Sequence, residues 1–269
     1  MSTPPLLIID PGTSHPELEC VEWLAREARA LGLEALLCLP ALPEQVERVA
    51  GSLEGSLSAP PFSLEGLQAL SAQPLSGLII LGSGASPEHT LPWQEALKAW
   101  LRAWLNAQGQ DTPVLGLCYG HQLLAHLSGA EIELLWAGDK ASGVRRVQLT
   151  PEPAHHTPHQ AALSDDALSR GGCFELIVSH REGFKRAPKG WRALCVSSTL
   201  TRSLPTGEQL SPVEAVEAMK HERSPWWGFQ AHLEAVEGFL VNNSVARELP
   251  SPYEGHELVR AFLKRCTVL

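Results

Sequence analysis

Four short apolar segments alternate with segments of helical periodicity in the first half of this 269-residue chain, and no other feature restricts its fold as strongly. The apolar segments are residues 5–10, 35–40, 77–82 and 113–118. Between them, apolar side chains recur at helical spacing over about 16–31, where Ser14 is a candidate cap, and over 93–107. Continuous apolar strands that alternate with helices are typical of a parallel sheet covered on both faces. We therefore predict an α/β fold with a mainly parallel sheet flanked by helices.

The second half of the chain shows a different pattern, in which strand-like segments follow one another closely. These segments are residues 143–150, 174–180, 192–198, 215–221 and 226–234. Short connections are typical of antiparallel strands, so we expect a mixed or antiparallel extension of the same sheet. A final helix is expected over about 255–266. No internal repeat or low-complexity linker interrupts the sequence, which favours one domain spanning residues 1–269.

Charge and composition exclude several classes of partner. The net charge of −9 disfavours binding to a nucleic-acid backbone, which needs clustered lysines and arginines. The most basic segment, residues 181–189, is interrupted by Glu182, Gly183 and Pro188 and is expected to be a solvated loop. The N-terminus lacks the features of a signal peptide, and no apolar stretch approaches the roughly 20 residues of a membrane helix. We therefore expect neither nucleic acid nor a membrane as a partner.

The six cysteines are scattered without the spacing of a disulfide framework or a zinc site. In a long chain with no secretion signal they indicate free thiols in a reducing compartment, so we expect a cytoplasmic protein. Five of them can serve as small apolar packing residues. The context of Cys118 distinguishes it from the others.

Cys118 is the centre of a G-x-C-x-G motif, placed where the predicted strand 113–118 meets a helix that starts near His121. This motif is the thiol counterpart of the G-x-S-x-G nucleophile elbow. Gly116 and Gly120 lack the Cβ atoms that would clash in so tight a turn, and the helix N-terminus favours the thiolate. The alternative is a glycine-rich turn around a buried structural cysteine.

A base for Cys118 must come from the 11 histidines, and His232 has the most suggestive neighbours. Residues i and i+2 of an extended chain point to the same side, so Glu234 is placed to accept a hydrogen bond from one nitrogen of His232. The other nitrogen would then take the proton of Cys118. Together they would supply a nucleophile, a base and an orienting carboxylate. The alternative is a surface histidine beside a surface glutamate, a pair that chance often produces.

The segments GLCYGHQLLAHLSGA and WWGFQAHLE together resemble class I glutamine amidotransferases. Members of that family typically carry G-x-C-x-G-H-Q in the middle of the chain and G-x-Q-x-H-P-E near its end. The order and spacing match, and the resemblance runs from about residue 5 to residue 265. It implies a flavodoxin-like, mainly parallel sheet flanked by helices, in agreement with the apolar pattern. The Pro92-Trp93 helix resembles a standalone subgroup similar to γ-glutamyl peptidases and guanylate-synthase-like domains.

The resemblance also implies a reaction. The Cys118 thiolate would attack the γ-carbonyl of glutamine or of a γ-glutamyl compound, and His232 would protonate the departing amine. Water activated by His232 would then hydrolyse the γ-glutamyl thioester and release glutamate. Glu234 would hold the histidine in the useful tautomer.

Further site residues follow from the same resemblance. The backbone N–H groups of Tyr119 and Ser83 would bind the oxyanion of the tetrahedral intermediate. The family usually has Gly-Gly-Pro where this chain has Gly82-Ser83-Gly84, and without the resemblance this segment is equally an ordinary strand-end turn. Residues expected to bind substrate are Gly82, Gln122, Ser179, His180, Arg181 and Glu182.

Three departures from the family pattern bear on specificity. Glu182 replaces the usual aspartate of an S-H-x-D segment, and Arg181 replaces a residue that is commonly small. A bulky cation at the pocket mouth would either reject some substrates or recruit a second carboxylate, as in a peptide. Leu233 replaces the usual proline between the histidine and the glutamate, which should preserve the hydrogen bond but alter the local backbone.

No cofactor is implied by the sequence, and no metal site is expected. The cluster formed by His155, His156 and His159 lies in a proline-rich segment without a matching frame of cysteines or carboxylates. A solvated loop is the favoured interpretation of this cluster.

Three functions remain open at this point. The first is a glutaminase subunit that passes ammonia to a synthase on another chain, since no ATP-grasp or P-loop motif is present. The second is a γ-glutamyl peptidase or hydrolase that needs no partner. The third is a non-catalytic, regulatory relative that keeps the fold, against which the intact Cys118, His232 and Glu234 argue.

Overall fold

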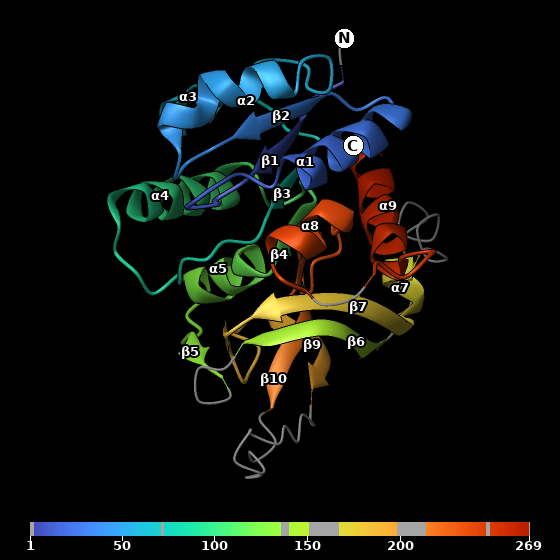
Figure 1. Ribbon diagram of the computed structural model, residues 1–269. Helices are drawn as coiled ribbons and strands as arrows, with labels where there is room; N and C mark the ends of the chain where they lie inside the picture. The colour runs from blue at the N-terminus through green and yellow to red at the C-terminus, as the bar shows by residue number, and fades with distance from the viewer. Residues whose placement is uncertain are drawn as a thin grey trace.

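The computed structural model describes residues 3–70, 73–135, 140–150, 167–197, 214–245 and 248–268. Its centre is a seven-stranded sheet with the order β2-β1-β3-β4-β11-β10-β9 (Figure 1). The strands are β1 (Leu6–Ile9), β2 (Ala35–Cys38), β3 (Gly77–Ile80), β4 (Val114–Leu117), β9 (Trp191–Ser197), β10 (Ala215–His221) and β11 (Trp226–Phe229).

The pairing within this sheet confirms the predicted fold class. Strands β2, β1, β3, β4 and β11 are mutually parallel, although β11 comes from the far end of the chain. Strands β10 and β9 continue the sheet by antiparallel pairing. The result is a mainly parallel α/β sheet with an antiparallel extension built from the second half.

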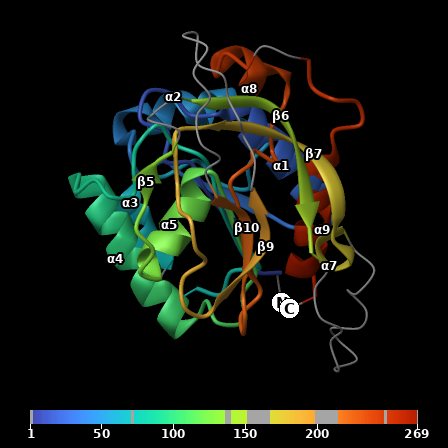
Figure 2. The same ribbon diagram turned by 90° about the horizontal axis from the view of Figure 1, so that it is seen from below.

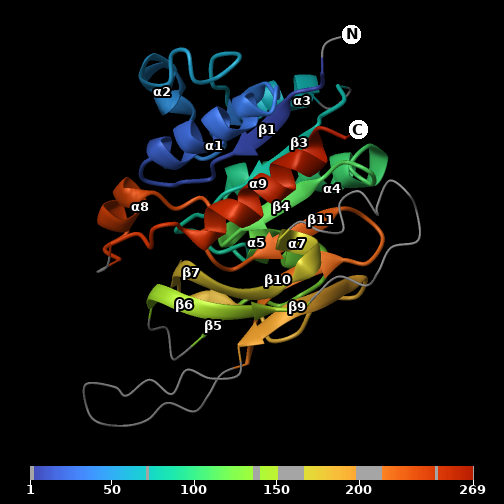
Figure 3. The ribbon, with the colours of Figure 1, turned by 90° about the vertical axis from the view of Figure 1, so that its right-hand side faces the viewer.

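Helices cover both faces of the sheet, as Figures 2 and 3 show. One face carries α1 (Leu18–Ala30) and α9 (Glu254–Cys266), and the other carries α3 (Leu64–Leu70), α4 (Pro92–Ala107) and α5 (Tyr119–Leu127). Strand β1 has a continuously apolar sequence because it lies between the two helical layers. Leu6 and Ile8 join the core on the side of α1, whereas Leu7 and Ile9 join the core on the side of α4.

Strands β6 (Ala141–Leu149) and β7 (Gly172–His180) form a separate two-stranded antiparallel sheet. The expectation that both would extend the central sheet was therefore wrong. Along much of their length buried and more exposed residues alternate, so the pair lays one apolar face on the core instead of pairing edge to edge. A second, shorter pair joins β5 (Glu133–Leu134) to β8 (Glu182–Gly183).

The start of α1 also differs from expectation, because Ser14 does not cap it. The Ser14 hydroxyl lies 2.9 Å from the His15 ring, and the helix has no side-chain cap. Instead, the Asp10 carboxylate accepts hydrogen bonds from the backbone N–H groups of Gly12 and Glu17, at 2.9 and 2.8 Å. Burial raises the pKa of Asp10 to about 7, against the lowering effect of these bonds. This carboxyl group shapes the loop between β1 and α1.

Several short helical segments were not indicated by the sequence pattern. They are η1 (Pro43–Gln45), α2 (Val46–Ser52), α7 (Ala167–Arg170) and α8 (Glu237–Asn242). Each is too short for helical periodicity to stand out. None of the helices in the described ranges is long and apolar enough to cross a membrane.

Candidate active site

Cys118 occupies the sharp turn between β4 and α5. Its φ of 50° and ψ of −102° lie outside the regions that non-glycine residues ordinarily adopt. A Cβ on Gly116 would come within 2.5 Å of the Gly120 carbonyl oxygen, and one on Gly120 would come closer still to the carbonyl oxygen of Ile80. Both obstacles are backbone atoms. The two glycines of the motif are therefore what allow the strained strand-to-helix turn.

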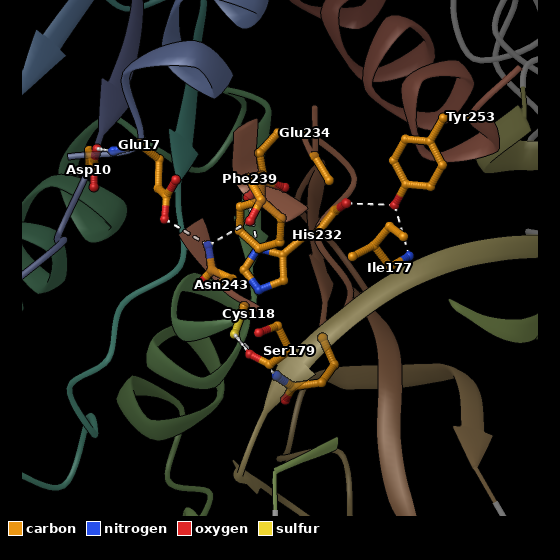
Figure 4. Close-up of polar contacts among 12 residues, drawn as sticks. Asp10, Glu17, Cys118, Ile177, Ser179, His232, Glu234, Phe239, Asn243 and Tyr253 are labelled. Carbon is orange, nitrogen blue, oxygen red and sulfur yellow. Dashed lines mark hydrogen bonds and ion pairs between the residues drawn. The ribbon is translucent and has the colours of Figure 1, made fainter. Parts of the chain in front are cut away.

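His232 and Glu234 lie in the turn beyond β11. The extended conformation expected over 226–234 is therefore wrong past Phe229, where the strand ends. The turn nevertheless places His232 Nδ1 3.0 Å from Glu234 Oε1, with both side chains buried. Figure 4 shows the imidazole ring between Glu234 and Cys118. The three residues expected to form a triad are thus brought together.

The surroundings of His232 favour its protonated form. Burial alone would lower its pKa, but the charges of Cys118 and Glu234, and hydrogen bonds to both, outweigh burial and raise the pKa to about 10. Because Glu234 holds Nδ1, the Nε2 side of the ring is the one available to Cys118. This arrangement places a protonated imidazole beside the sulfur of Cys118, where the ring can donate a proton.

The backbone of His232 is held by β7 both directly and through Tyr253. The His232 N–H donates to the carbonyl of Ile177 at 2.8 Å. The Tyr253 hydroxyl donates to the His232 carbonyl at 2.6 Å and accepts from the Ile177 N–H at 3.0 Å (Figure 4). The ring of Phe239, on α8, packs against the imidazole, with 4.3 Å between the two ring centroids. No local sequence pattern indicates these contacts, because Ile177 and Tyr253 are distant from His232 along the chain.

Gln230 is a further contact of Cys118 that the sequence pattern did not single out. Its Nε2 donates to Cys118 Sγ at 3.6 Å, and its Oε1 accepts from Gln122 Nε2 at 3.2 Å. Gln122 Nε2 also donates to the carbonyl of Glu182 at 2.8 Å. The family pattern G-x-Q-x-H-P-E could have indicated Gln230, because Gln230 is the glutamine of that pattern in this chain. Two amide side chains thus connect the cysteine to the segment after β7.

A cavity of about 470 Å³ opens beside these groups. Cys118, His232 and Glu234 line it. The residues expected to bind substrate also line it, namely Gly82, Gln122, Ser179, His180, Arg181 and Glu182. Ser83 is among the lining residues, whereas the side chain of Tyr119 is buried in the core on the α4 side. The structure therefore gathers the expected side chains around one cavity, and their roles remain predictions.

The loop after β3 packs directly against the catalytic candidates. A Cβ on Gly82 would lie 2.7 Å from His232 Cε1. The Ser83 hydroxyl donates to the Pro11 carbonyl at 2.7 Å and accepts from the Ala85 N–H at 3.1 Å. These bonds tie the loop to the segment after β1. A loop held by such hydrogen bonds suits the expected oxyanion contact from the Ser83 N–H.

His180 is buried and uncharged near neutral pH. Burial, and then the charge of Arg145, lower its pKa to about 3. Its Nδ1 lies 3.1 Å from the carbonyl oxygen of Glu182, so the Nδ1–H donates to that oxygen. This bond shapes the turn that carries Arg181, whose side chain is exposed at the cavity.

One wall of the cavity was not predicted from the sequence. It is formed by the loop before α1, by α8 with the residue that follows it, and by the segment before β6. Asn243 Nδ2 donates to Glu17 Oε1 at 3.0 Å, and Lys140 Nζ donates to the Asn243 carbonyl at 3.1 Å. These three residues belong to distant parts of the chain, so only the fold brings them together.

The other cysteines differ from Cys118 in position and environment. Burial raises the pKa of Cys20, Cys38, Cys195 and Cys266, which keeps these thiols protonated at neutral pH. Cys173 is exposed on β7 and does not line the cavity. Of the cysteines, Cys118 alone lines this cavity.

Among the residues that the structure describes, no group of three or more His, Cys, Asp or Glu side chains is arranged to hold a metal ion. The cluster of His155, His156 and His159 lies outside the described residues.

Comparisons with solved structures agree with the fold. A glutamine amidotransferase from Thermotoga maritima matches with a TM-score of 0.59 at 16% identity, over 99% of this chain and 97% of its own. One from Methylobacillus flagellatus matches with a TM-score of 0.55 at 17% identity, over 99% and 93% of the two chains. At such low identity these likenesses establish the fold alone.

Sequence relatives extend the comparison. A glutamine-hydrolysing GMP synthase subunit from Archaeoglobus fulgidus is 29% identical over 190 residues, which cover 70% of this chain and 75% of the relative. The corresponding protein of Pyrococcus abyssi is 26% identical over 202 residues, covering 74% and 80%. The family model for glutamine amidotransferase class-I matches residues 58–245. The chain therefore belongs to the class I glutamine amidotransferase family.

Proposed function

We propose that this protein hydrolyses the γ-amide bond of glutamine or of a γ-glutamyl compound through a thioester on Cys118. The observation that carries the proposal is the contact of His232 with both Glu234 and Cys118 at the edge of one cavity. A buried imidazolium held by a carboxylate beside a strained cysteine is suited to nucleophilic catalysis. The same contact argues against a non-catalytic relative.

The first half of the reaction forms the thioester. The Cys118 thiolate adds to the γ-carbonyl carbon, and the negative charge moves to the carbonyl oxygen. The N–H groups of Ser83 and Tyr119 are proposed to bind this oxyanion. The tetrahedral intermediate then collapses, the C–N bond breaks, and the Nε2 proton of His232 passes to the departing nitrogen. The amine leaves in neutral form, and the imidazole is left neutral.

The second half of the reaction restores the enzyme. Neutral His232 accepts a proton from a water molecule, which adds to the thioester carbonyl. When this second intermediate collapses, the C–S bond breaks and the thiolate of Cys118 is released. The imidazolium and thiolate are then both regenerated, and the acyl group departs as glutamate. Glu234 stabilises the imidazolium in both halves.

Relatives that are named as glutamine-hydrolysing subunits support glutamine as the substrate. On this proposal the chain acts as a standalone glutaminase that passes ammonia to a synthase partner. The second candidate is a γ-glutamyl hydrolase that acts without a partner. The presence of two cations at the cavity, Lys140 and the exposed Arg181, favours this candidate, because glutamine carries only one carboxylate for them to match.

The test of the central step is covalent labelling. The protein would be incubated with 6-diazo-5-oxo-norleucine, a γ-glutamyl electrophile, and its intact mass measured. We expect one adduct in the wild type and in Cys173→Ala, which removes the exposed thiol on β7, and none in Cys118→Ala. Equal labelling of Cys118→Ala, or no adduct on the wild-type protein, would overturn the proposal.

Turnover separates the two candidate functions. A glutaminase that serves a synthase should hydrolyse glutamine slowly until that partner is added. A partner-independent hydrolase should cleave γ-glutamyl amides or peptides at full rate alone. Strong turnover of a γ-glutamyl peptide by the isolated chain, with little release of ammonia from glutamine, would exclude the synthase-dependent function.

A further inference from the structure

The cavity contains two cationic side chains, Lys140 and Arg181, whereas the single carboxylate of glutamine can use only one of them. The leaving group of glutamine is ammonia, which carries no anion. A cation near the departing nitrogen would therefore have nothing to bind. The positions of the two side chains show which part of a substrate each one can reach.

Lys140 lies on the wall of the cavity that adjoins His232. Its Nζ donates to the carbonyl of Asn243, the residue that follows α8. The same helix carries Phe239, whose ring contacts the His232 imidazole at a centroid distance of 4.3 Å. Figure 4 shows Asn243 and Phe239 beside the imidazole ring. In the proposed reaction His232 protonates the departing nitrogen, so this wall faces the leaving group.

Arg181 lies within electrostatic reach of Lys140. The pKa of Lys140 is lowered, first by burial and then by the positive charge of Arg181, while the charge of Cys118 acts in the opposite direction. The lysine is thus close to both the second cation and the nucleophile. Two cations directed at one cavity repel each other, and an anion bound between them would relieve that repulsion.

The charges of the substrate support the same conclusion. A γ-glutamyl group carries one ammonium and one carboxylate. In the cavity, Glu182 can match the ammonium and one cation can match the carboxylate. The second cation can then match an additional anion. A volume of about 470 Å³ lies within the range of about 300–1,000 Å³ that is usual for pockets that bind drug-sized ligands.

We propose that Lys140 forms an anion subsite for a carboxylate on the leaving amine, while Arg181 is left to match the α-carboxylate of the γ-glutamyl group. The preferred substrates would then be γ-glutamyl amino acids or peptides. This inference rests on the proposed function, because the group it concerns departs as the Cys118 thioester forms. The nitrogen that receives the His232 proton belongs in this case to an amino acid or peptide, and the remaining steps are unchanged.

The test compares two substrates that differ only at the proposed anion. They are γ-glutamylglycine, which has a leaving-group carboxylate, and γ-glutamylglycinamide, in which that carboxylate is a neutral amide. We expect the wild type to favour the carboxylate in kcat/KM by about tenfold or more, the usual scale of a charge-assisted contact. Lys140→Met should bring this ratio close to one while changing kcat/KM for the amide by less than about twofold.

Two further measurements guard against a trivial result. Lys185→Met is the matched control, because Lys185 is an exposed lysine paired with Glu133 outside the cavity. It should keep the wild-type ratio. Binding of both compounds to Cys118→Ala, measured by calorimetry, should show the same preference without turnover.

Two outcomes would overturn the inference. A wild-type ratio near one would show that the leaving-group carboxylate is not recognised. An equal loss for both substrates in Lys140→Met would show that the lysine serves the shared γ-glutamyl part instead. If either result appears while Cys118 is labelled normally, this inference fails and the proposed function stands. Absence of the Cys118 adduct would remove both.

Discussion

Gly82 shows how little space surrounds the His232 ring. A Cβ at this position would lie 2.7 Å from His232 Cε1, whereas one on Gly84 in the same loop would meet nothing nearer than Thr13 Oγ1 at 3.8 Å. Gly82→Ala should therefore displace the imidazole and lower kcat/KM on the order of 10–100-fold, because a small misplacement of a catalytic group is costly. Gly84→Ala should remain close to wild type. Steady-state kinetics of both variants, with thermal unfolding as a check on folding, measure the difference. Equal activity in the two would contradict the steric argument.

The protonation of His232 gives a prediction with a definite sign. Its pKa is raised from 6.5 to about 10, and the carboxylate of Glu234 contributes to that rise. Glu234→Gln keeps the shape of the side chain but removes its charge, so the pKa of His232 should fall. Nuclear magnetic resonance titration of the imidazole measures this directly. An unchanged titration midpoint would show that Glu234 only orients the ring.

The same raised pKa links His232 to stability. A histidine with a folded pKa above its unfolded value stabilises the fold fully below about pH 6.5, and this contribution is lost as the pH rises through about 10. Thermal unfolding across this range should therefore show a loss at high pH that is smaller in Glu234→Gln.

At the scale of elements, Tyr253 connects the start of α9 to β7 and to the turn that carries His232. Tyr253→Phe would remove two buried hydrogen bonds, one from the Tyr253 hydroxyl to the His232 carbonyl and one from the Ile177 N–H to that hydroxyl. We expect a stability loss of about 1–3 kcal/mol and, if His232 acts as proposed, a lower kcat with little change in KM, because the proposed base is displaced while the proposed substrate contacts remain.

The control for Tyr253→Phe is a hydroxyl deletion away from the site. Ser128→Ala, at the end of α5, removes the acceptor of the Trp191 indole N–H at 2.9 Å. It should cost stability without lowering kcat. If both variants lose stability and neither loses activity, the Tyr253 contact is structural only.

Local sequence pattern was sufficient for elements whose own side chains show how they are buried, on both faces in β1 and on one face in α4. The continuous apolar run of β1 and the helical spacing of α4 each follow from the side-chain environment of a single element. The turn at Cys118 was equally predictable, because the need for Gly116 and Gly120 arises from backbone atoms close to them.

Features that depend on contacts between distant segments could not be predicted in this way. The sequences of β6 and β7 indicate strands but not the sheet they join, since partner choice depends on the packing of the whole molecule. The prediction that Ser14 caps α1 was wrong, because the carboxylate of Asp10, just after β1, accepts the backbone N–H groups of Gly12 and Glu17 instead. Tyr253 and Lys140 reach the site only through the fold.

At the scale of the whole molecule, the two halves of the chain share one core. Leu6 and Ile8 of the central sheet belong to the same buried cluster as Val147, Phe174 and Leu194 from the second half. Neither half could keep this apolar surface buried alone. We therefore propose that residues 1–269 form one cooperative domain.

An ion pair between Arg145 on β6 and Glu217 on β10 joins the two-stranded sheet to the central one. The Glu217 side chain is 1% exposed, and burial raises its pKa while the charge of Arg145 opposes the rise. Arg145→Met would leave this carboxylate buried without its partner, so we expect a stability loss of about 3–5 kcal/mol at neutral pH. The double variant Arg145→Met with Glu217→Gln should recover most of that loss.

The pH dependence of the Arg145→Met variant distinguishes this cause from a simple loss of packing. A carboxyl group with a raised folded pKa binds its proton more tightly in the folded state, so the stability of Arg145→Met should rise as the pH is lowered through that pKa. The double variant lacks the Glu217 carboxyl group, so its rise should be smaller and should come only from other buried carboxyl groups such as Asp10. Urea unfolding of both variants at neutral and mildly acidic pH measures the difference. Because the pair couples two sheets that share one core, each protein should still unfold in a single transition, and a second transition would contradict the proposed single domain.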